Sequence, residues 1–166
     1  MTFKNIDANR EAQLTNKTEA PIHHAIRNKS IDIAKILLES GQVDLAIKYK
    51  YKYKYYYKEE TPLYCAIDEE MNYDTINLVL SQEKIDVNSK HIYNNISKRK
   101  ISGEERIYVD DDDGYDIEEH REDEITPLFR AIDKHLDYNI IQLLINKDGI
   151  DVNLKRHTTF VEKSKS

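Results

Sequence analysis

The residues best suited to chemistry in this 166-residue chain are an acidic run, one cysteine and six histidines. The acidic run Asp110-Asp111-Asp112-Asp113 precedes Gly114, an arrangement that suggests a calcium loop. An EF-hand loop needs its first ligand five residues before that glycine and a glutamate six residues after it. Those two positions hold Val109 and His120. The sequence therefore predicts no calcium loop here and favours a solvated run of charge.

The cysteine and the histidines do not form a catalytic or metal-binding set. A catalytic thiol at Cys65 would need a histidine and an oxyanion-stabilising arrangement, and the sequence supplies no pattern for either. No pair of histidines or cysteines has zinc-ligand spacing, and the four glycines form no phosphate loop. We expect no metal, no cofactor and no catalytic activity. The histidines are His23, His24, His91, His120, His135 and His157.

The length and composition predict a soluble protein with one folded domain. Charged residues make up 34% of the sequence, the net charge is −6, and the mean hydropathy is −0.75. No apolar run approaches the length of about 18 residues that a membrane helix needs, and the N-terminus lacks the apolar stretch of a signal peptide. Because the chain has one cysteine and no export signal, we expect the protein to be located in the cytoplasm, with the nucleus as the alternative.

A short phrase occurs three times and predicts the elements that carry all these residues. The phrase contains each of the three prolines of the chain and is followed at fixed distance by a second apolar pair and a short ending. Self-similarity of this kind indicates a repeat architecture. The three phrases are Ala20–Ile26, Thr61–Ile67 and Thr126–Ile132, and their endings are Val43–Ala46, Ile85–Asn88 and Ile150–Asn153.

Each phrase carries the signals of a helix start. Proline is favoured at the first helical position, and a preceding threonine accepts a hydrogen bond from a free amide. Thr61 and Thr126 therefore open helices, whereas Ala20 opens one less securely. Apolar residues three and four apart then predict a short amphipathic helix, and a polar turn leads to a second apolar helix. Neither helix is long enough to be stable alone, so stacking must hold them.

The pattern TPLxxAI with an IDVN ending resembles the ankyrin repeat, whose unit is about 33 residues long. The resemblance implies an all-α repeat solenoid of stacked helix pairs with insertions at the hairpin loops. The histidine of the family signature is present only as His23, with Tyr64 and Phe129 at the equivalent positions. The implied organisation is a cap or tail at 1–19, repeats at 20–46, 61–88 and 126–153 within residues 20–153, insertions at about 47–60 and 89–125, and a tail at 154–166.

The resemblance also implies a non-catalytic scaffold that binds a protein partner through hairpin loops and exposed positions of the opening helices. The partner is unidentified, membrane association is not expected, and we expect a monomer. Cys65 is interpreted as exposed because His24 and Arg130 occupy the equivalent positions. The expected helix positions are His24, Arg27, Asn28, Cys65, Asp68, Glu69, Arg130, Asp133 and Lys134.

The first insertion contains an alternating run of tyrosine and lysine at 49–58, which holds six of the twelve tyrosines. As one extended strand it would place its odd-numbered tyrosines on one side and most lysines on the other. One interpretation is a lengthened hairpin arm that contacts a partner, because tyrosine gives a large contact area and lysine attracts acidic partners. The other is a tolerated expansion of a short coding repeat. If the run is ordered, the binding surface also includes Tyr51, Tyr53, Tyr55 and Tyr57.

The second insertion changes sign along its length, from a basic first half to an acidic second half. Residues 89–125 contain six basic and twelve acidic residues, a net charge of −6 that equals the net charge of the whole chain. A charge block of this kind predicts a disordered, solvated loop. The alternative is that the two oppositely charged halves fold back on each other, although surface ion pairs stabilise little.

Two other functions are compatible with the sequence. The tyrosine–lysine run has the composition of a single-strand nucleic-acid site or of a site for another acidic partner. A sequence pI near 5.5 and the acidic insertion argue against nucleic acid. The chain could instead be a fragment of a longer repeat array with no independent activity, because three repeats are close to the minimum for stability.

Overall fold

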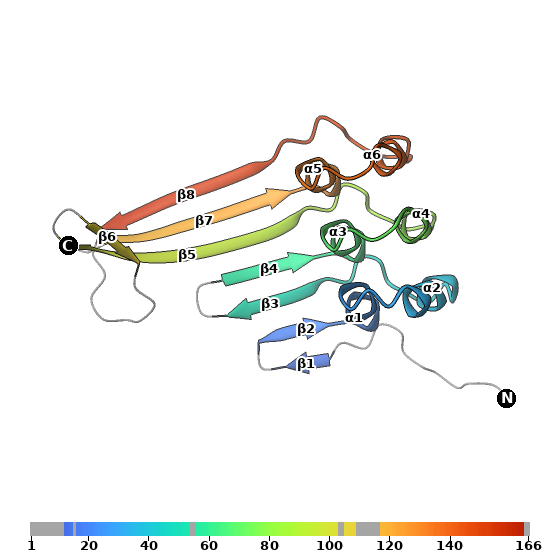
Figure 1. Ribbon diagram of the computed structural model, residues 1–166, viewed down its shortest axis with the longest axis horizontal. Coiled ribbons are helices and arrows are strands. Elements are labelled where there is room, and N and C mark those ends of the chain that lie inside the picture. Colours follow the sequence, from blue (N-terminus) through green and yellow to red (C-terminus); the bar gives the residue numbers. More distant parts are fainter. Residues whose placement is uncertain (1–11, 15, 54–55, 103–104, 109–116, 165–166) are drawn as a thin grey trace.

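The computed structural model describes residues 12–14, 16–53, 56–102, 105–108 and 117–164, and it places helix pairs along one end of an antiparallel sheet (Figure 1). The helices are α1 (Pro21–Arg27), α2 (Ile31–Glu39), α3 (Pro62–Asp68), α4 (Tyr73–Leu80), α5 (Pro127–Asp133) and α6 (Tyr138–Ile145). The strands are β1 (Ala12–Leu14), β2 (Lys17–Glu19), β3 (Tyr49–Tyr53), β4 (Tyr56–Glu60), β5 (His91–Ser102), β6 (Glu105–Tyr108), β7 (Ile117–Ile125) and β8 (His157–Ser164).

The helix pairs form three stacked units: unit 1 is α1 and α2, unit 2 is α3 and α4, and unit 3 is α5 and α6. Helices α1, α3 and α5 lie next to the strands, and α2, α4 and α6 form an outer row (Figure 1). Each inner helix contacts the inner helix of the next unit, and each outer helix contacts the next outer helix. The units are therefore held by stacking, as their short helices require.

The predicted helix starts are confirmed. The hydroxyl oxygen of Thr61 accepts from the backbone N–H of Tyr64 at 3.4 Å, and that of Thr126 accepts from the N–H of Phe129 at 3.3 Å. Ala20 supplies no side-chain acceptor at the start of α1. Unit 1 consequently begins with one less satisfied amide than units 2 and 3.

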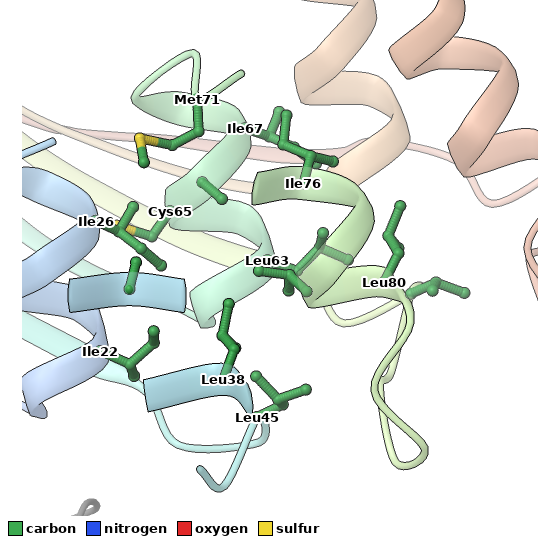
Figure 2. Close-up of a cluster of buried hydrophobic side chains, with 14 of the residues drawn as sticks. Ile22, Ile26, Leu38, Leu45, Leu63, Cys65, Ile67, Met71, Ile76 and Leu80 are labelled. Carbon is green, nitrogen blue, oxygen red and sulfur yellow. The ribbon is translucent and has the colours of Figure 1, made fainter. Parts of the chain in front are cut away.

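The core lies between the two helix rows and continues from unit to unit. Ile22 and Leu63 are fully buried near the starts of their inner helices, and Ile26 and Ile67 are fully buried one turn later. Figure 2 shows Leu38 of α2 between Ile22 and Leu63, and Ile67 beside Ile76 of α4. The periodic apolar positions of the sequence are thus the buried face of each helix.

The all-α expectation is wrong, because residues 12–14 and 17–19 of the N-terminal segment, both insertions and the C-terminal tail form strands. Within the described residues they build an eight-stranded antiparallel sheet in the order β1-β2-β3-β4-β5-β7-β8, with β6 paired to β5. Alternating tyrosine and lysine suits a strand, because successive side chains point to opposite faces. The hydrogen bonds of such a ladder join residues far apart in sequence, which a repeat pattern of helices does not reveal.

The second insertion is a paired ribbon and not a disordered loop over 91–102 and 117–125. Strands β5 and β7 pair over nine positions, from His91 opposite Ile125 to Arg99 opposite Ile117. The basic half of the insertion therefore lies along its acidic half, as the fold-back alternative proposed. Lys90, just before β5, also donates to Glu124 at 2.7 Å. The acidic run Asp110–Asp113 lies outside the described residues.

The first insertion folds into a hairpin, as the arm interpretation expected. Tyr51 lies opposite Lys58, and Lys52 lies opposite Tyr57, so Tyr57 of β4 is on the other face from Tyr49 and Tyr51 of β3, whereas Tyr56 shares their face. Tyr57 therefore lies on the face opposite to Tyr51, contrary to the expectation that they share a side.

In the part of the chain that the structure describes, no helix is long and apolar enough to cross a membrane.

Candidate protein-binding groove

One face of the sheet and the inner helices border a groove at the junctions between units. On β4 this face carries Tyr56, Lys58 and Glu60, while Tyr57 and Glu59 point to the other side because strand residues alternate. A cavity of about 330 Å³ lies between β4, β5 and β7 of the sheet and α3 and α5 of the helix row. Its lining includes tyrosines and both signs of charge. We refer to this cavity, together with the sheet face and the inner helices that border it, as the groove.

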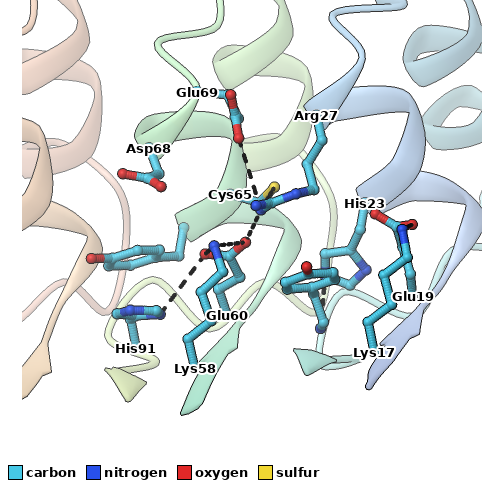
Figure 3. A network of polar contacts seen from close by, with 12 residues as sticks. Lys17, Glu19, His23, Arg27, Lys58, Glu60, Cys65, Asp68, Glu69 and His91 are labelled. Atoms are coloured by element: carbon cyan, nitrogen blue, oxygen red, sulfur yellow. Dashed lines mark hydrogen bonds and ion pairs between the residues drawn. The ribbon is translucent and has the colours of Figure 1, made fainter. Parts of the chain in front are cut away.

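A buried carboxylate sits where units 1 and 2 meet. The Glu60 side chain is fully buried and accepts from the Arg27 guanidinium of unit 1 and from the Lys58 ammonium at 3.2 Å. Burial raises the pKa of Glu60, and the two cations oppose that shift. Burial by itself would lower the pKa of Arg27, but the charge of Glu60 outweighs it and raises the pKa. Figure 3 shows this network extending to Glu69 and His91.

Two histidines occupy swapped places in units 1 and 2. In unit 1, His23 of the helix accepts from the backbone N–H of Tyr49 on the strand at 3.2 Å. In unit 2 the tyrosine is on the helix, and Tyr64 stacks on His91 of the strand with ring centroids 4.2 Å apart. Burial lowers the pKa of His23 and of His91 to about 4, so both rings are neutral at pH 7.

The tyrosines of the groove face form a row across three strands. Tyr51 of β3 and Tyr56 of β4 have ring centroids 5.6 Å apart, and Tyr56 and Tyr93 of β5 are 5.2 Å apart, both edge to face. Arg27 lies over the ring of Tyr49 at 4.4 Å, which adds a cation–π contact. A cavity of about 540 Å³ opens between Tyr49, Tyr51, Tyr56, Arg27 and Lys58.

The predicted helix positions come together mainly as ion pairs between units. Arg130 of unit 3 donates to Asp68 of unit 2 at 2.8 Å, and Lys134 donates to Glu70 at 3.1 Å. Arg27 lies 3.8 Å from Glu69 across the other junction. Burial would raise the pKa of Asp68, but the hydrogen bond from Arg130 outweighs it and lowers the pKa. Asp68 and Arg130 therefore line the groove while also joining units 2 and 3.

The remaining predicted positions are placed less uniformly. His24 is 65% exposed; its Nδ1 donates to the carboxylate of Glu19 at 3.2 Å, and its Nε2 accepts from the side-chain amide of Asn28 at 2.8 Å. Asp133 lies 3.7 Å from Arg156, which precedes β8. For Tyr53 only the backbone is described, within β3. Tyr55 lies outside the described residues.

The interpretation of Cys65 as exposed is wrong. Cys65 is fully buried, and its Sγ lies 3.8 Å from Nη1 of Arg27. Burial raises the pKa of the thiol, so it is protonated at neutral pH. The longer side chains at the equivalent positions, His24 and Arg130, reach out past the helix surface, whereas the short cysteine remains beneath Arg27. Cys65 is therefore buried although the residues at the equivalent positions of units 1 and 3 are partly exposed.

Sequence reasoning missed the strand side chains of the groove, above all Glu60, His91 and Tyr93. A signal was present for one of them: Tyr49, His91 and Arg156 each follow the third residue of the repeat ending by four positions. In the described part of the chain, no group of acidic, histidine or cysteine residues is arranged to hold a metal ion.

The comparisons with known proteins agree with this architecture. A family model of ankyrin repeats matches residues 2–91 in three copies. The chain belongs to the ankyrin-repeat family. Ankyrin repeats generally mediate protein–protein interactions, and the family is typically non-enzymatic. No curated protein matches the chain. The match ends before unit 3, yet α5 and α6 of this ankyrin chain repeat the arrangement of α3 and α4.

Proposed function

We propose that this ankyrin chain is a non-catalytic scaffold that binds a protein partner in the groove. The observation that carries the proposal is the row Tyr51, Tyr56 and Tyr93, which is partly buried beside an open cavity. Tyrosine is enriched at binding hot spots because its ring covers a large area and loses little conformational entropy. The row is also pre-organised, because its rings already contact each other.

The helix wall of the groove supports the same proposal with charge. Asp68 is 20% exposed and Arg130 is 30% exposed, so their ion pair has a solvent-facing side that a partner can reach. Both signs of charge occur along the wall: Arg27 lies beside Glu69, and Lys134 lies beside both Asp68 and Glu70. Such a mixture of charges selects a partner with complementary polar groups and not a uniformly charged polymer.

The experiment is affinity capture with the intact chain and two variants. Replacing Tyr51 and Tyr93 by serine removes the two ends of the row, whereas Tyr57→Ser removes a tyrosine from the opposite face of the same hairpin. We expect the double variant to lose the captured partner by roughly thirtyfold or more, the effect of a hot-spot residue of at least about 2 kcal/mol.

The Tyr57→Ser control should capture the partner as well as the wild type does. Circular dichroism melting curves of all three proteins show whether the fold is retained. Equal capture by the wild type and a folded double variant would overturn the proposal, as would equal losses in the double variant and the control.

A further inference from the structure

The third unit exposes apolar residues that the first two units bury. Ile132, Ile145 and Val152 are 52%, 46% and 53% exposed. At the equivalent positions of unit 2, Ile67, Leu80 and Val87 are between 0% and 3% exposed, because unit 3 covers them. A repeat that ends a stack is expected to have a polar outer surface. We call Ile132, Ile145 and Val152 the end face.

The opposite end of the stack is also apolar and exposed. Ile33 and Ile36 of α2 are 55% and 68% exposed. Ile33 lies ten residues before Val43, and the residues ten before Ile85 and Ile150 are Thr75 and Ile140. Thr75 and Ile140 are buried, at 0% and 7% exposed. They belong to outer helices that each contact the outer helix of the preceding unit. We call Ile33 and Ile36 the front face.

We propose that the end face of one chain docks on the front face of a second copy, head to tail. These two faces are the two halves of an interface that the chain already makes twice, between α2 and α4 and between α4 and α6. A second copy therefore continues the stack with the packing that joins its own units. This proposal departs from the sequence-based expectation of a monomer.

Polar groups across the proposed junction correspond to those of the internal one. Asp68 of unit 2 binds Arg130, which is the fourth residue of the next inner helix, as His24 is of α1. Asp133 is the equivalent of Asp68 in unit 3, and its side chain is 40% exposed. In the second copy, His24 occupies the place of Arg130, and its side chain is 65% exposed. Docking in the same register brings Asp133 beside His24 of the second copy.

The sheet continues through the same junction if one short strand gives way. β8 leaves unit 3 as β3 and β5 leave units 1 and 2, and each of those strands pairs with the strand that enters the next unit. The entering strand of the second copy is β2, which in one chain pairs with β1 over three positions. The eight residues of β8 replace β1 at that edge, so an exposed strand edge becomes paired.

Two complementary variants test the proposal. Ile145→Lys places a charge on the end face, Ile33→Lys places one on the front face, and both sites are exposed enough to accept lysine without unfolding. Tyr73→Lys is the matched control, because Tyr73 is 43% exposed on α4, in the middle of the stack. Analytical ultracentrifugation over a range of concentrations measures the molar mass of each protein, and circular dichroism confirms that each is folded.

We expect the wild type and Tyr73→Lys to grow beyond a dimer as concentration rises, because a head-to-tail contact does not close on itself. Each lysine variant alone should be monomeric, and an equimolar mixture of the two should form a dimer and nothing larger. A wild type that stays monomeric at all concentrations overturns the proposal. So does a dimer of Ile33→Lys alone, which would indicate that two end faces pair with each other.

Discussion

The two junctions of the stack are held in different ways. Between units 1 and 2, the carboxylate of Glu60 is completely buried and is bound by Arg27 and Lys58. Between units 2 and 3, Asp68 and Arg130 form a pair that is 20% and 30% exposed. The side-chain amide of Asn88 adds two further bonds there, to the carbonyl of Gly149 at 2.8 Å and from the N–H of Asp151 at 3.0 Å.

The difference matters because buried and exposed charges respond differently to the loss of a partner. An exposed ion pair contributes little, since water replaces the lost contact. A buried charge left without its partner has no water to replace it. The first junction should therefore depend strongly on a single residue, whereas the second depends on several weak contacts.

The largest expected effect comes from Glu60→Gln, which keeps the shape of the side chain and removes its charge. Lys58, which is 11% exposed, and Arg27, which is 25% exposed, would then face a buried neutral amide, and we expect the free energy of unfolding to fall by about 3 kcal/mol. The matched variant Asp68→Asn at the second junction should cost at most about 1 kcal/mol. Urea denaturation measures both values. Similar losses in the two variants would mean that the junctions are not different.

The second effect is a loss of stability on mild acidification. His23 and His91 have a folded-state pKa of about 4, below the ordinary value of 6.5, so the unfolded chain binds protons that the folded chain does not. Stability is therefore present above pH 6.5 and falls as the pH drops towards 4. Between pH 7 and 5 we expect a loss of about 2 kcal/mol for each histidine. Glu60, whose pKa is raised, acts in the opposite direction.

His91→Phe isolates one of these contributions, because phenylalanine still stacks on Tyr64 but does not titrate. Denaturation curves between pH 7 and 5 should show about half of the wild-type pH dependence, while carboxylates with lowered pKa values, such as Asp68, stay ionised in that range. An unchanged pH dependence in this variant would contradict the account of the buried ring.

The third effect concerns helix starts. Thr61→Ala removes the side-chain acceptor that α3 uses, and we expect a loss of about 1 kcal/mol. The reverse change, Ala20→Thr, gives α1 the acceptor that it lacks and should add a similar amount. Thermal melting of both variants measures the shifts, which should have opposite signs. A destabilised Ala20→Thr variant would show that α1 has no room for the added side chain.

The smallest expected effect is at the amide bridge of the second junction. Asn88→Ala removes two hydrogen bonds at an exposed site, and we expect a loss of about 0.5 to 1 kcal/mol. Ala46 is the equivalent residue at the first junction. In urea denaturation, Ala46→Asn should raise the free energy of unfolding by at most the same amount. A larger gain would show that such hydrogen bonds stabilise the first junction more than the second.

The helices could be predicted from the sequence because their signals are local. Thr61, its proline and the apolar residues spaced three and four apart lie within a few positions of each other, and the structure confirms them. The burial of Ile67 followed from the same periodicity. The exposure of Ile132 did not, because it depends on whether another unit follows.

The sheet and much of the groove could not be predicted, because they depend on pairing between distant residues. Glu60 meets Arg27 across 33 positions, and His91 reaches Tyr64 only through the register of β4 and β5. The predicted residues Asp68 and Arg130 do meet, but as partners of each other. A repeat pattern marks which helix positions face the groove, and it does not show which of them are already paired.

The most direct test of the proposed function is photo-crosslinking in living cells from two positions of the β3–β4 hairpin. A photoreactive amino acid at Tyr51 reports contacts in the groove, and the same group at Tyr57 reports contacts on the opposite face. We expect a crosslinked protein partner from position 51 and none from position 57. A partner that crosslinks from position 57 but not from position 51 would show that the partner does not bind in the groove.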